Sequence, residues 1–180
     1  MPYFVAHHST SPTTIQQRYG PVHIIDVTSR GAEPWVRFSP FYPHGDIPVP
    51  FSPGYTSASV EGIWQGLKVF ERMDVDTTKC KITSMKGIKR SSKKYGAVLG
   101  HRAGVEGKRL LIYVEARRAI YLPSYHWVLS HKLQDLLEQS AQLAATQTVV
   151  FLDYETNCDF DDLRSPLSRA GLVKRYREGS

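Results

Sequence analysis

The chain has 180 residues, and its 41% hydrophobic and 11% aromatic content is enough to bury a substantial core, which excludes a disordered polypeptide. Its 23 Lys and Arg against 17 Asp and Glu give a net charge of +6, which favours anionic partners without indicating nucleic acid in particular. The two cysteines exclude a disulfide scaffold and a four-cysteine zinc site. Because we find neither a secretory signal pattern nor an apolar run of membrane length, we expect a cytoplasmic protein without a membrane partner.

The first third of the chain contains short predicted elements and a proline-rich segment. Residues 1–20 are polar and predict a loosely held N-terminal lead-in, whereas the β-branched run VHIIDV at 22–27 predicts a strand. Residues 34–55 contain six prolines, which exclude a helix and a central strand. Because this segment is also rich in aromatic residues, we expect it to be ordered, extended and part of a pocket wall.

Residues 56–72 predict a helix. Apolar residues recur there at helical spacing, and Ser57 or Ser59 can cap the first turn. Gly62 and Gly66, four residues apart, each weaken a helix by about 1 kcal/mol relative to alanine. Glycines at this spacing therefore predict the close approach of another backbone or of a ligand.

The remainder of the chain predicts further helices and strands. Segment 79–102 carries eight basic residues and no acidic one, and it predicts a helix ending near Gly96, followed by a glycine-rich turn. Four later elements are expected, namely a strand at 109–116, a long helix at 123–145, a strand at 148–154 and a final helix at 165–176. With no internal repeat and no clear domain break, the sequence predicts one compact α+β domain over 21–180, mainly helical with a small sheet.

Three polar residues of the helix predicted at 56–72 are candidates for a functional site. Glu61, Gln65 and Lys68 stand at i, i+4 and i+7, so they share one side of a helix. A carboxylate, an amide and an ammonium arranged in this way either line a polar pocket or form the solvated flank of an amphipathic helix. The spacing alone leaves both interpretations open.

Two segments resemble the signature of the NADAR family. They are Phe38–Pro43 (FSPFYP) and, after a short excursion, Ser59–Lys68 (SVEGIWQGLK). Their order and spacing are similar to the S-N-F-Y-P and S-V-E-x-x-Y/W-Q-x-x-K segments of that family. The chain departs from the family pattern at Pro40, at Gly62 and in the acidic residues 153–162, so it resembles a divergent member.

The resemblance implies an NADAR-like fold and an N-glycosidase that cleaves a ribose–nitrogen bond in an ADP-ribosyl or ribosyl nucleotide, such as modified guanine or a NAD-derived nucleotide. Breaking such a bond develops positive charge on the sugar, which a carboxylate can stabilise while an acid protonates the leaving nitrogen. The implied catalytic residues are Glu61, Lys68 and Asp153. The implied substrate-binding residues are Phe38, Ser39, Tyr42, Trp64, Gln65, Lys86, Lys89 and Arg117. The resemblance implies no cofactor and no metal.

Within this scheme each residue type suits a different part of the substrate. Glu61 would face the sugar or activate water, and Gln65 would orient a ribose hydroxyl. Trp64 or Tyr42 would stack on the base. Lys68 or Lys89 would hold phosphate or form an imine with an opened ribose.

Other functions stay open at this point. The protein could bind and sequester an ADP-ribose-type nucleotide without cleaving it, or serve as a basic accessory protein that binds nucleic acid, with ADP-ribosylated nucleic acid as a further candidate partner. The basic residues at 86–94 either hold a diphosphate or form a solvated face. The acidic residues 153–162 lack the spacing of an EF-hand, which leaves a different metal site or an Asp153 side chain that faces the pocket.

Overall fold

The computed structural model describes residues 2–179 and has an α+β fold, which confirms the predicted class. Its contacts divide the chain into two compact units: unit 1 is formed by Met1–Ser39 together with Leu129–Ser180, and unit 2 by Pro40–Val128. The sequence predicts a single domain over 21–180 instead. A unit assembled from both ends of a chain leaves no linker-like composition at its boundaries, so sequence patterns do not reveal the division.

Unit 1 is built on three parallel strands in the spatial order β1-β8-β2. The strands are β1 (Tyr3–His7), β2 (Val22–Asp26) and β8 (Thr148–Asp153). The strands predicted at 22–27 and 148–154 are therefore confirmed. The prediction of a loosely held lead-in is wrong, because β1 pairs with β8 along its whole length, from Tyr3 opposite Val149 to His7 opposite Asp153.

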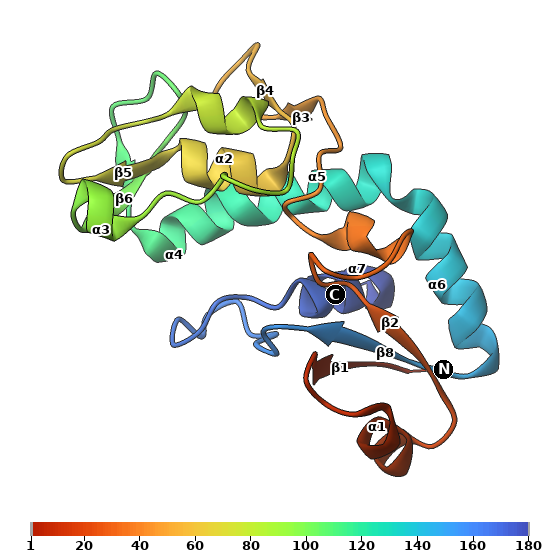
Figure 1. The fold of residues 1–180 in the computed structure, drawn as a ribbon. Coiled ribbons are helices and arrows are strands. Elements are labelled where there is room, and N and C mark those ends of the chain that lie inside the picture. Colours follow the sequence, from red (N-terminus) through yellow and green to blue (C-terminus); the bar gives the residue numbers. More distant parts are fainter. Residues whose placement is uncertain (1, 180) are drawn as a thin grey trace. The chain divides into compact units, whose positions relative to one another are not determined.

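Helices cover both faces of this sheet. Unit 1 contains α1 (Pro12–Tyr19), the short 3-10 helix η1 (Trp35–Phe38), α6 (Gln134–Thr146) and α7 (Arg169–Glu178). Figure 1 shows α1 and α7 on opposite sides of the three strands. The interior of the central strand β8 is accordingly apolar, and Val149, Val150 and Phe151 are fully buried.

Two helices of the predicted set begin or end at other residues in the structure. The single helix predicted at 123–145 is interrupted at Leu133, whose φ of −127° is not helical, so that α5 (Leu122–Lys132) ends before α6 begins. The apolar periodicity continues through the interruption because Leu133 is itself buried. The final helix begins after Ser168, whose hydroxyl accepts a hydrogen bond from the Gly171 amide, rather than at residue 165.

Unit 2 consists of short helices and antiparallel strands around α2. Its helical segments are α2 (Val60–Gly66), the 3-10 helix η2 (Thr77–Lys81), α3 (Ser92–Tyr95), α4 (Tyr113–Ala116) and the π-helical turn η3 (Arg117–Tyr121). Strand β3 (Ile47–Pro48) pairs with β4 (Thr56–Ser57), and a three-stranded sheet contains β5 (Lys68–Phe70), β6 (Val98–Arg102) and β7 (Leu110–Leu111). The predicted helix end near Gly96 is confirmed, since α3 ends one residue before this glycine, whose φ is +85°.

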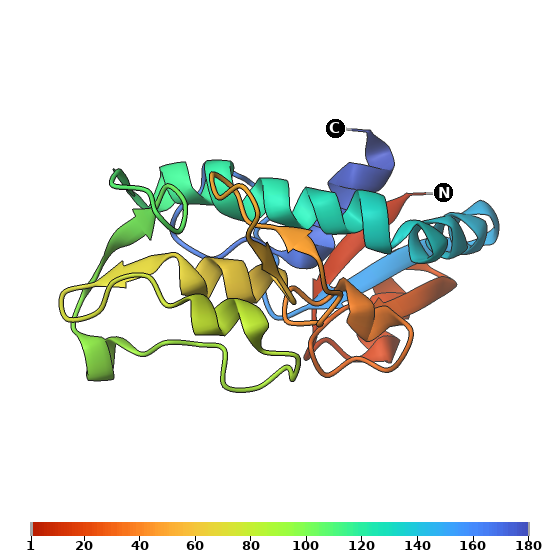
Figure 2. The same ribbon diagram turned by 90° about the horizontal axis from the view of Figure 1, so that it is seen from above.

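Two predictions for unit 2 are wrong. The helix predicted at 56–72 ends at Gly66, and the chain continues as strand β5, so Lys68 does not lie on a helix. The strand predicted at 109–116 is limited to β7, because the Glu115 carboxylate accepts a hydrogen bond from the Ile112 amide and starts α4. Figure 2 shows α4, η3 and α5 following one another along a continuous helical rod.

The two glycines of α2 allow the η2 segment to approach the helix closely, as the sequence predicts. A methyl group on Gly62 would lie 2.8 Å from the Lys79 carbonyl oxygen and 2.8 Å from the Ser57 hydroxyl. A methyl group on Gly66 would meet the Cys80 sulfur at 3.1 Å as its nearest neighbour. The backbone approach is therefore tighter at Gly62.

We expect the Gly62→Ala substitution to lower the free energy of unfolding by about 1–3 kcal/mol, because overpacking against a backbone carbonyl outweighs the gain of about 1 kcal/mol in helix propensity. Urea unfolding measured by circular dichroism tests this. Gly66→Ala is the matched control on the same helix, and it should change stability by less. Equal stability of Gly62→Ala and the wild type would contradict the close approach.

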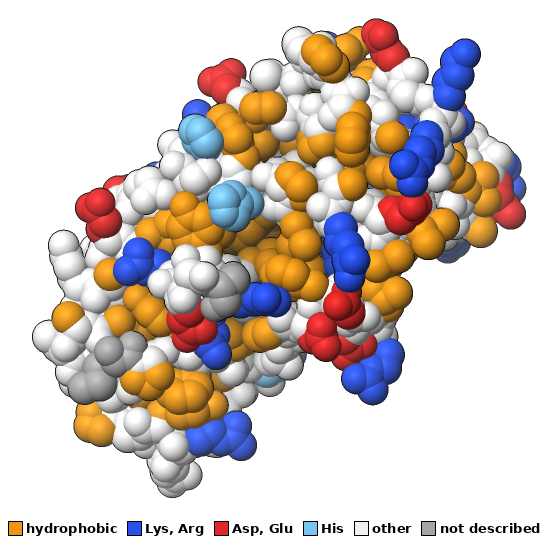
Figure 3. Space-filling model, turned by 180° about the vertical axis from the view of Figure 1, so that it is seen from behind, with side chains coloured by type: hydrophobic (Ala, Val, Ile, Leu, Met, Phe, Trp, Pro, Cys, Tyr) orange, Lys and Arg blue, Asp and Glu red, His pale blue; other side chains and the backbone are white. Residues whose placement is uncertain are grey.

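Charged and apolar side chains are both exposed on the surface. On the face drawn in Figure 3, basic, acidic and apolar side chains are interspersed. Large apolar residues exposed in the structure include Phe51 and Ile112, which are 57% and 61% accessible. Among residues 2–179, no helix combines the length and the apolar character needed to cross a membrane.

Candidate functional site

Helix α2 places an acid and an amide together in the interior of unit 2. Its first turn is capped by the Ser59 hydroxyl, which accepts a hydrogen bond from the Gly62 amide at 3.0 Å. One turn apart on this helix, Gln65 Nε2 donates a hydrogen bond of 2.8 Å to Glu61 Oε1. Glu61 is 7% exposed and Gln65 is 4% exposed. The two side chains are therefore not the solvated flank of an amphipathic helix, which was one of the two interpretations of their spacing.

Arg90 holds the other end of the Gln65 amide. Its backbone N–H donates to Gln65 Oε1 at 3.0 Å, and its guanidinium donates to the carbonyl oxygens of Gln65, Lys68 and Asp74 at 3.1, 2.6 and 2.8 Å. The guanidinium also lies 4.8 Å from the Phe70 ring centre, and the residue is only 7% exposed. Arg90 thus ties together the end of α2, strand β5 and the following loop. Because its guanidinium is engaged in these hydrogen bonds, Arg90 has a structural role, and we no longer consider it for diphosphate binding.

Lys68 begins strand β5 and reaches the same region. Its Nζ lies 5.9 Å from the Trp64 ring centre. Burial lowers the pKa of Lys68, the nearby Glu61 carboxylate raises it, and the positive charges of Arg90 and Lys89 lower it further, so that the net direction is downward. The Lys68 amine therefore loses its proton more readily than an ordinary lysine.

An aromatic cluster surrounds the Trp64 indole. Its ring centre is 3.8 Å from that of His101, 6.0 Å from that of Tyr113 and 5.6 Å from that of Tyr121. The two tyrosines meet the indole edge-on, a favourable arrangement for aromatic rings. His101 lies directly opposite Lys68 in the β5–β6 pairing, so both side chains leave the same face of the sheet.

His101 is the part of this site that sequence reasoning missed. The residue is 1% exposed, and neither ring nitrogen has a hydrogen-bond partner among the described residues. Burial lowers the pKa of His101 to about 3, the Lys68 charge contributes in the same direction, and the Trp64 backbone opposes them weakly. The imidazole is therefore neutral at physiological pH. A histidine between Gly100 and Arg102 carries no spacing that would have predicted this position.

The predicted substrate-binding residues of unit 2 lie at different depths. Arg117 is buried in the π-helical turn η3, where its guanidinium donates to the Tyr113 hydroxyl at 3.0 Å and lies 4.9 Å from the same ring centre. π-Helical turns occur frequently at functional sites. Lys86 and Lys89 are exposed, and Lys89 Nζ lies 5.5 Å from the Phe41 ring. Tyr42 is half-buried, with its ring 4.9 Å from that of His44.

Three predicted site residues, namely Phe38, Ser39 and Asp153, belong to unit 1 and are buried there. Phe38 is fully buried and meets the Phe151 ring edge-on at 6.5 Å, and the adjacent Ser39 is 1% exposed. Asp153 is also fully buried; its carboxylate accepts hydrogen bonds from the Ser168 hydroxyl and the Ala170 amide at the start of α7. Phe38 thus contributes to the packing of unit 1, and Asp153 contributes to the start of α7.

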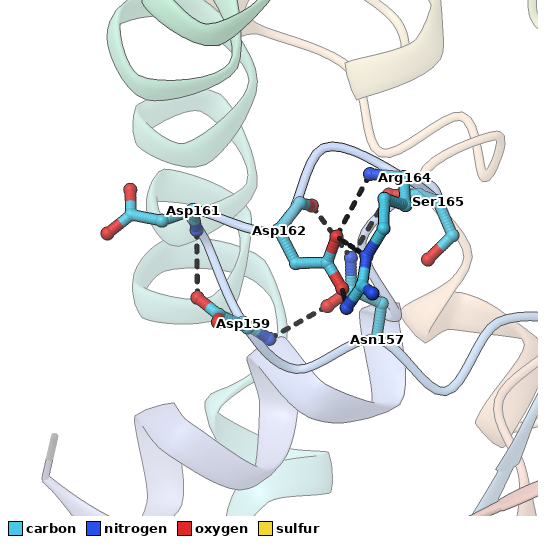
Figure 4. Close-up of polar contacts among 6 residues, drawn as sticks. All are labelled: Asn157, Asp159, Asp161, Asp162, Arg164 and Ser165. Carbon is cyan, nitrogen blue, oxygen red and sulfur yellow. Dashed lines mark hydrogen bonds and ion pairs between the residues drawn. The ribbon is translucent and has the colours of Figure 1, made fainter.

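Two carboxylates of the acidic loop after β8 have partners within the loop (Figure 4). Asp162 pairs with the Arg164 guanidinium at 2.9 Å, and Asp159 accepts a hydrogen bond from the Asp161 amide at 2.9 Å. Asn157 accepts a hydrogen bond from the Asp159 amide and donates to two carbonyl oxygens of the loop. Within residues 2–179, no three His, Cys, Asp or Glu side chains come together in a group that could hold a metal ion.

The chain is thus an α+β protein in which a buried acid–amide pair lies near a lysine of lowered pKa and an aromatic cluster. The chain belongs to DUF6939, described as a family of unknown function, whose family model matches residues 7–173 and so includes most of both units. Comparisons with curated proteins and with solved structures gave no match.

Proposed function

We propose that this protein is an N-glycosidase-like hydrolase that cleaves the ribose–nitrogen bond of an ADP-ribosyl or ribosyl nucleotide. The observation that carries the proposal is the buried Glu61 carboxylate, which Gln65 holds by a 2.8 Å hydrogen bond and which interacts electrostatically with Lys68. A carboxylate fixed in a site of low polarity stabilises positive charge on a nearby sugar more strongly than one in water. The motif resemblance to the NADAR family supports the same reaction.

In this mechanism Glu61 acts on the sugar. As the ribose–nitrogen bond breaks, its electron pair leaves with the base, and the carboxylate stabilises the resulting positive charge or activates the attacking water. The Gln65 amide donates to Glu61 and accepts from the Arg90 backbone, so Gln65 positions the carboxylate instead of orienting a ribose hydroxyl. Asp153 has no part in the proposal, because its carboxylate caps α7.

Lys68 and Trp64 provide for the rest of the nucleotide. As an ammonium, Lys68 attracts a substrate phosphate; as the neutral amine favoured by its lowered pKa, it can form an imine with the aldehyde of an opened ribose, with loss of water. The Trp64 indole and its two tyrosine neighbours offer flat surfaces on which a base can stack.

We expect Glu61→Gln to reduce turnover at least about a hundredfold while the protein remains folded, because the amide keeps the shape of the side chain and removes its charge. The assay incubates the full chain with NAD-derived nucleotides and with ADP-ribosylated guanosine and follows the products by mass spectrometry. The control variant is Glu138→Gln, which changes an exposed residue of α6 and should retain wild-type turnover.

Full activity of Glu61→Gln would contradict the assignment. If the wild type retains an intact nucleotide through gel filtration and cleaves none of the substrates, the hydrolase proposal fails and a protein that sequesters the nucleotide takes its place. Steeply salt-dependent binding to random DNA without nucleotide binding would instead favour the nucleic-acid accessory function.

A further inference from the structure

His101 is a buried polar side chain whose packing role an apolar ring could fill. The residue is 1% exposed, and both Nδ1 and Nε2 lack a hydrogen-bond partner in the described part of the chain. Leaving a polar group buried and unpaired is unfavourable, whereas phenylalanine would stack on the same neighbour without that penalty. The imidazole therefore lowers the stability of the fold, and a buried unpaired group of this kind calls for a role other than packing.

The surroundings of His101 define what that partner can be. The imidazole ring centre lies 3.8 Å from that of Trp64, and the edges of Tyr113 and Tyr121 flank the same indole. These flat neighbours favour a planar ring over a flexible or tetrahedral group. Because the Lys68 ammonium supplies positive charge across the strand pair, an anionic phosphate would pair with Lys68 in preference to a neutral imidazole.

A neutral imidazole offers one N–H donor and one nitrogen acceptor at fixed positions on one ring. The edge of a nucleobase presents donors and acceptors in the same plane. Hydrogen bonds to such an edge, combined with aromatic stacking, are the usual way in which proteins recognise an unstacked base.

We propose that His101 forms a hydrogen bond with the nucleobase of the substrate and thereby determines base specificity at this site. The Trp64 ring lies against that of His101 and is itself half-buried, so binding of a base at His101 requires the indole to turn aside, after which it can stack on the base. This inference rests on the proposed function, since the recognised base is the group that leaves when the ribose–nitrogen bond breaks. The inference adds to the proposed function the residue, His101, that selects the base.

The test compares ligands with and without a base on the full-length wild type and on His101→Phe. Calorimetry measures the dissociation constants of guanosine monophosphate, adenosine monophosphate and ribose 5-phosphate. We expect the wild type to bind at least one of the two nucleotides about tenfold more tightly than ribose 5-phosphate, and His101→Phe to lose that difference while its affinity for ribose 5-phosphate is unchanged. The melting temperature of His101→Phe should equal or exceed that of the wild type, because the variant buries no unpaired nitrogen.

A direct readout uses protein labelled with ¹⁵N-histidine. Base binding through His101 should shift one ring-nitrogen resonance that is absent from the spectrum of His101→Phe, and ribose 5-phosphate should not shift it. If His101→Phe does not fold, the effect of the two nucleotides and of ribose 5-phosphate on the wild-type spectrum decides the question.

The outcomes separate this inference from the hydrolase proposal. Turnover that depends on Glu61 but is unaffected by His101→Phe, with an unshifted His101 resonance, overturns the role of His101 and leaves the hydrolase proposal standing. Base-selective binding that requires His101 in a protein without turnover supports the inference and rejects the hydrolase. Equal affinity of the wild type for ribose 5-phosphate and both nucleotides overturns the inference outright.

Discussion

Acidification from pH 7 to pH 3 is expected to lower the free energy of unfolding of the wild type by about 4 kcal/mol more than that of His101→Phe. The reason is the buried imidazole, since burial and the Lys68 charge lower the pKa of His101 from 6.5 to about 3. Between about pH 6.5 and pH 3 the unfolded chain binds a proton at this histidine, whereas the folded chain does not. The contribution of the neutral His101 to the free energy of unfolding is therefore fully present above about pH 7. It decreases as the pH falls from about 6.5 to about 3, and it levels off below about pH 3.

The measurement is a series of urea unfolding curves for both proteins at pH values from 7 to 3. The difference between wild type and variant cancels the contribution of the carboxylates, which both chains share. This difference should change by up to about 1.4 kcal/mol per pH unit between pH 6 and pH 4. Parallel curves for the two proteins would show that His101 binds its proton over the same pH range in the folded and the unfolded state, and the lowered pKa of a buried imidazole would then be wrong.

Parts of the fold were predictable because their signals are local. The run at 22–27 is apolar and β-branched, and it forms β2 as expected. The Ser59 cap and the close approach at Gly62 also follow from residues within one or two turns of each other. The run RLLIYVEA at 109–116 has the same strand-like composition, yet only Leu110–Leu111 pairs as β7 and the rest becomes helical. The difference is the helix start provided by Glu115, a contact that composition does not represent.

The contact between Glu61 and Gln65 could be predicted from the sequence, whereas the position of Lys68 opposite His101 could not. Glu61 and Gln65 are four residues apart on one helix, so their contact follows from helical spacing alone. Lys68 joins them by a different route, because the chain leaves the helix and places it in β5, opposite His101. Lys68 lies opposite His101 only because β5 pairs with β6, and these strands are distant in the sequence. No local sequence pattern predicts this pairing.

Asp153→Ala is expected to lower the free energy of unfolding by about 3–5 kcal/mol. Asp153 is fully buried at the end of β8, where Oδ2 accepts hydrogen bonds from the Ser168 hydroxyl at 3.0 Å and the Ala170 amide at 3.1 Å. Its Oδ1 lies 3.1 Å from Arg169 Nε, and the Arg169 side chain is only 13% exposed. Removal of the carboxylate therefore leaves a largely buried guanidinium without its counter-charge, and it leaves the Ala170 amide and the Ser168 hydroxyl without their acceptor.

Two comparisons distinguish this structural role from a catalytic one. Asp135→Ala breaks the ion pair of an exposed carboxylate with Arg37 in the same unit, and it should cost no more than about 1 kcal/mol because the Asp135 side chain is 59% accessible. Asp153→Asn keeps the shape of the side chain and should recover part of the stability lost in Asp153→Ala. Stability comes from thermal and urea unfolding, and activity is measured under conditions where each variant is folded. Because the Asp153 carboxylate is buried and holds the start of α7, we expect folded Asp153→Asn to keep its turnover. A folded variant with wild-type stability and no turnover would return Asp153 to the catalytic residues.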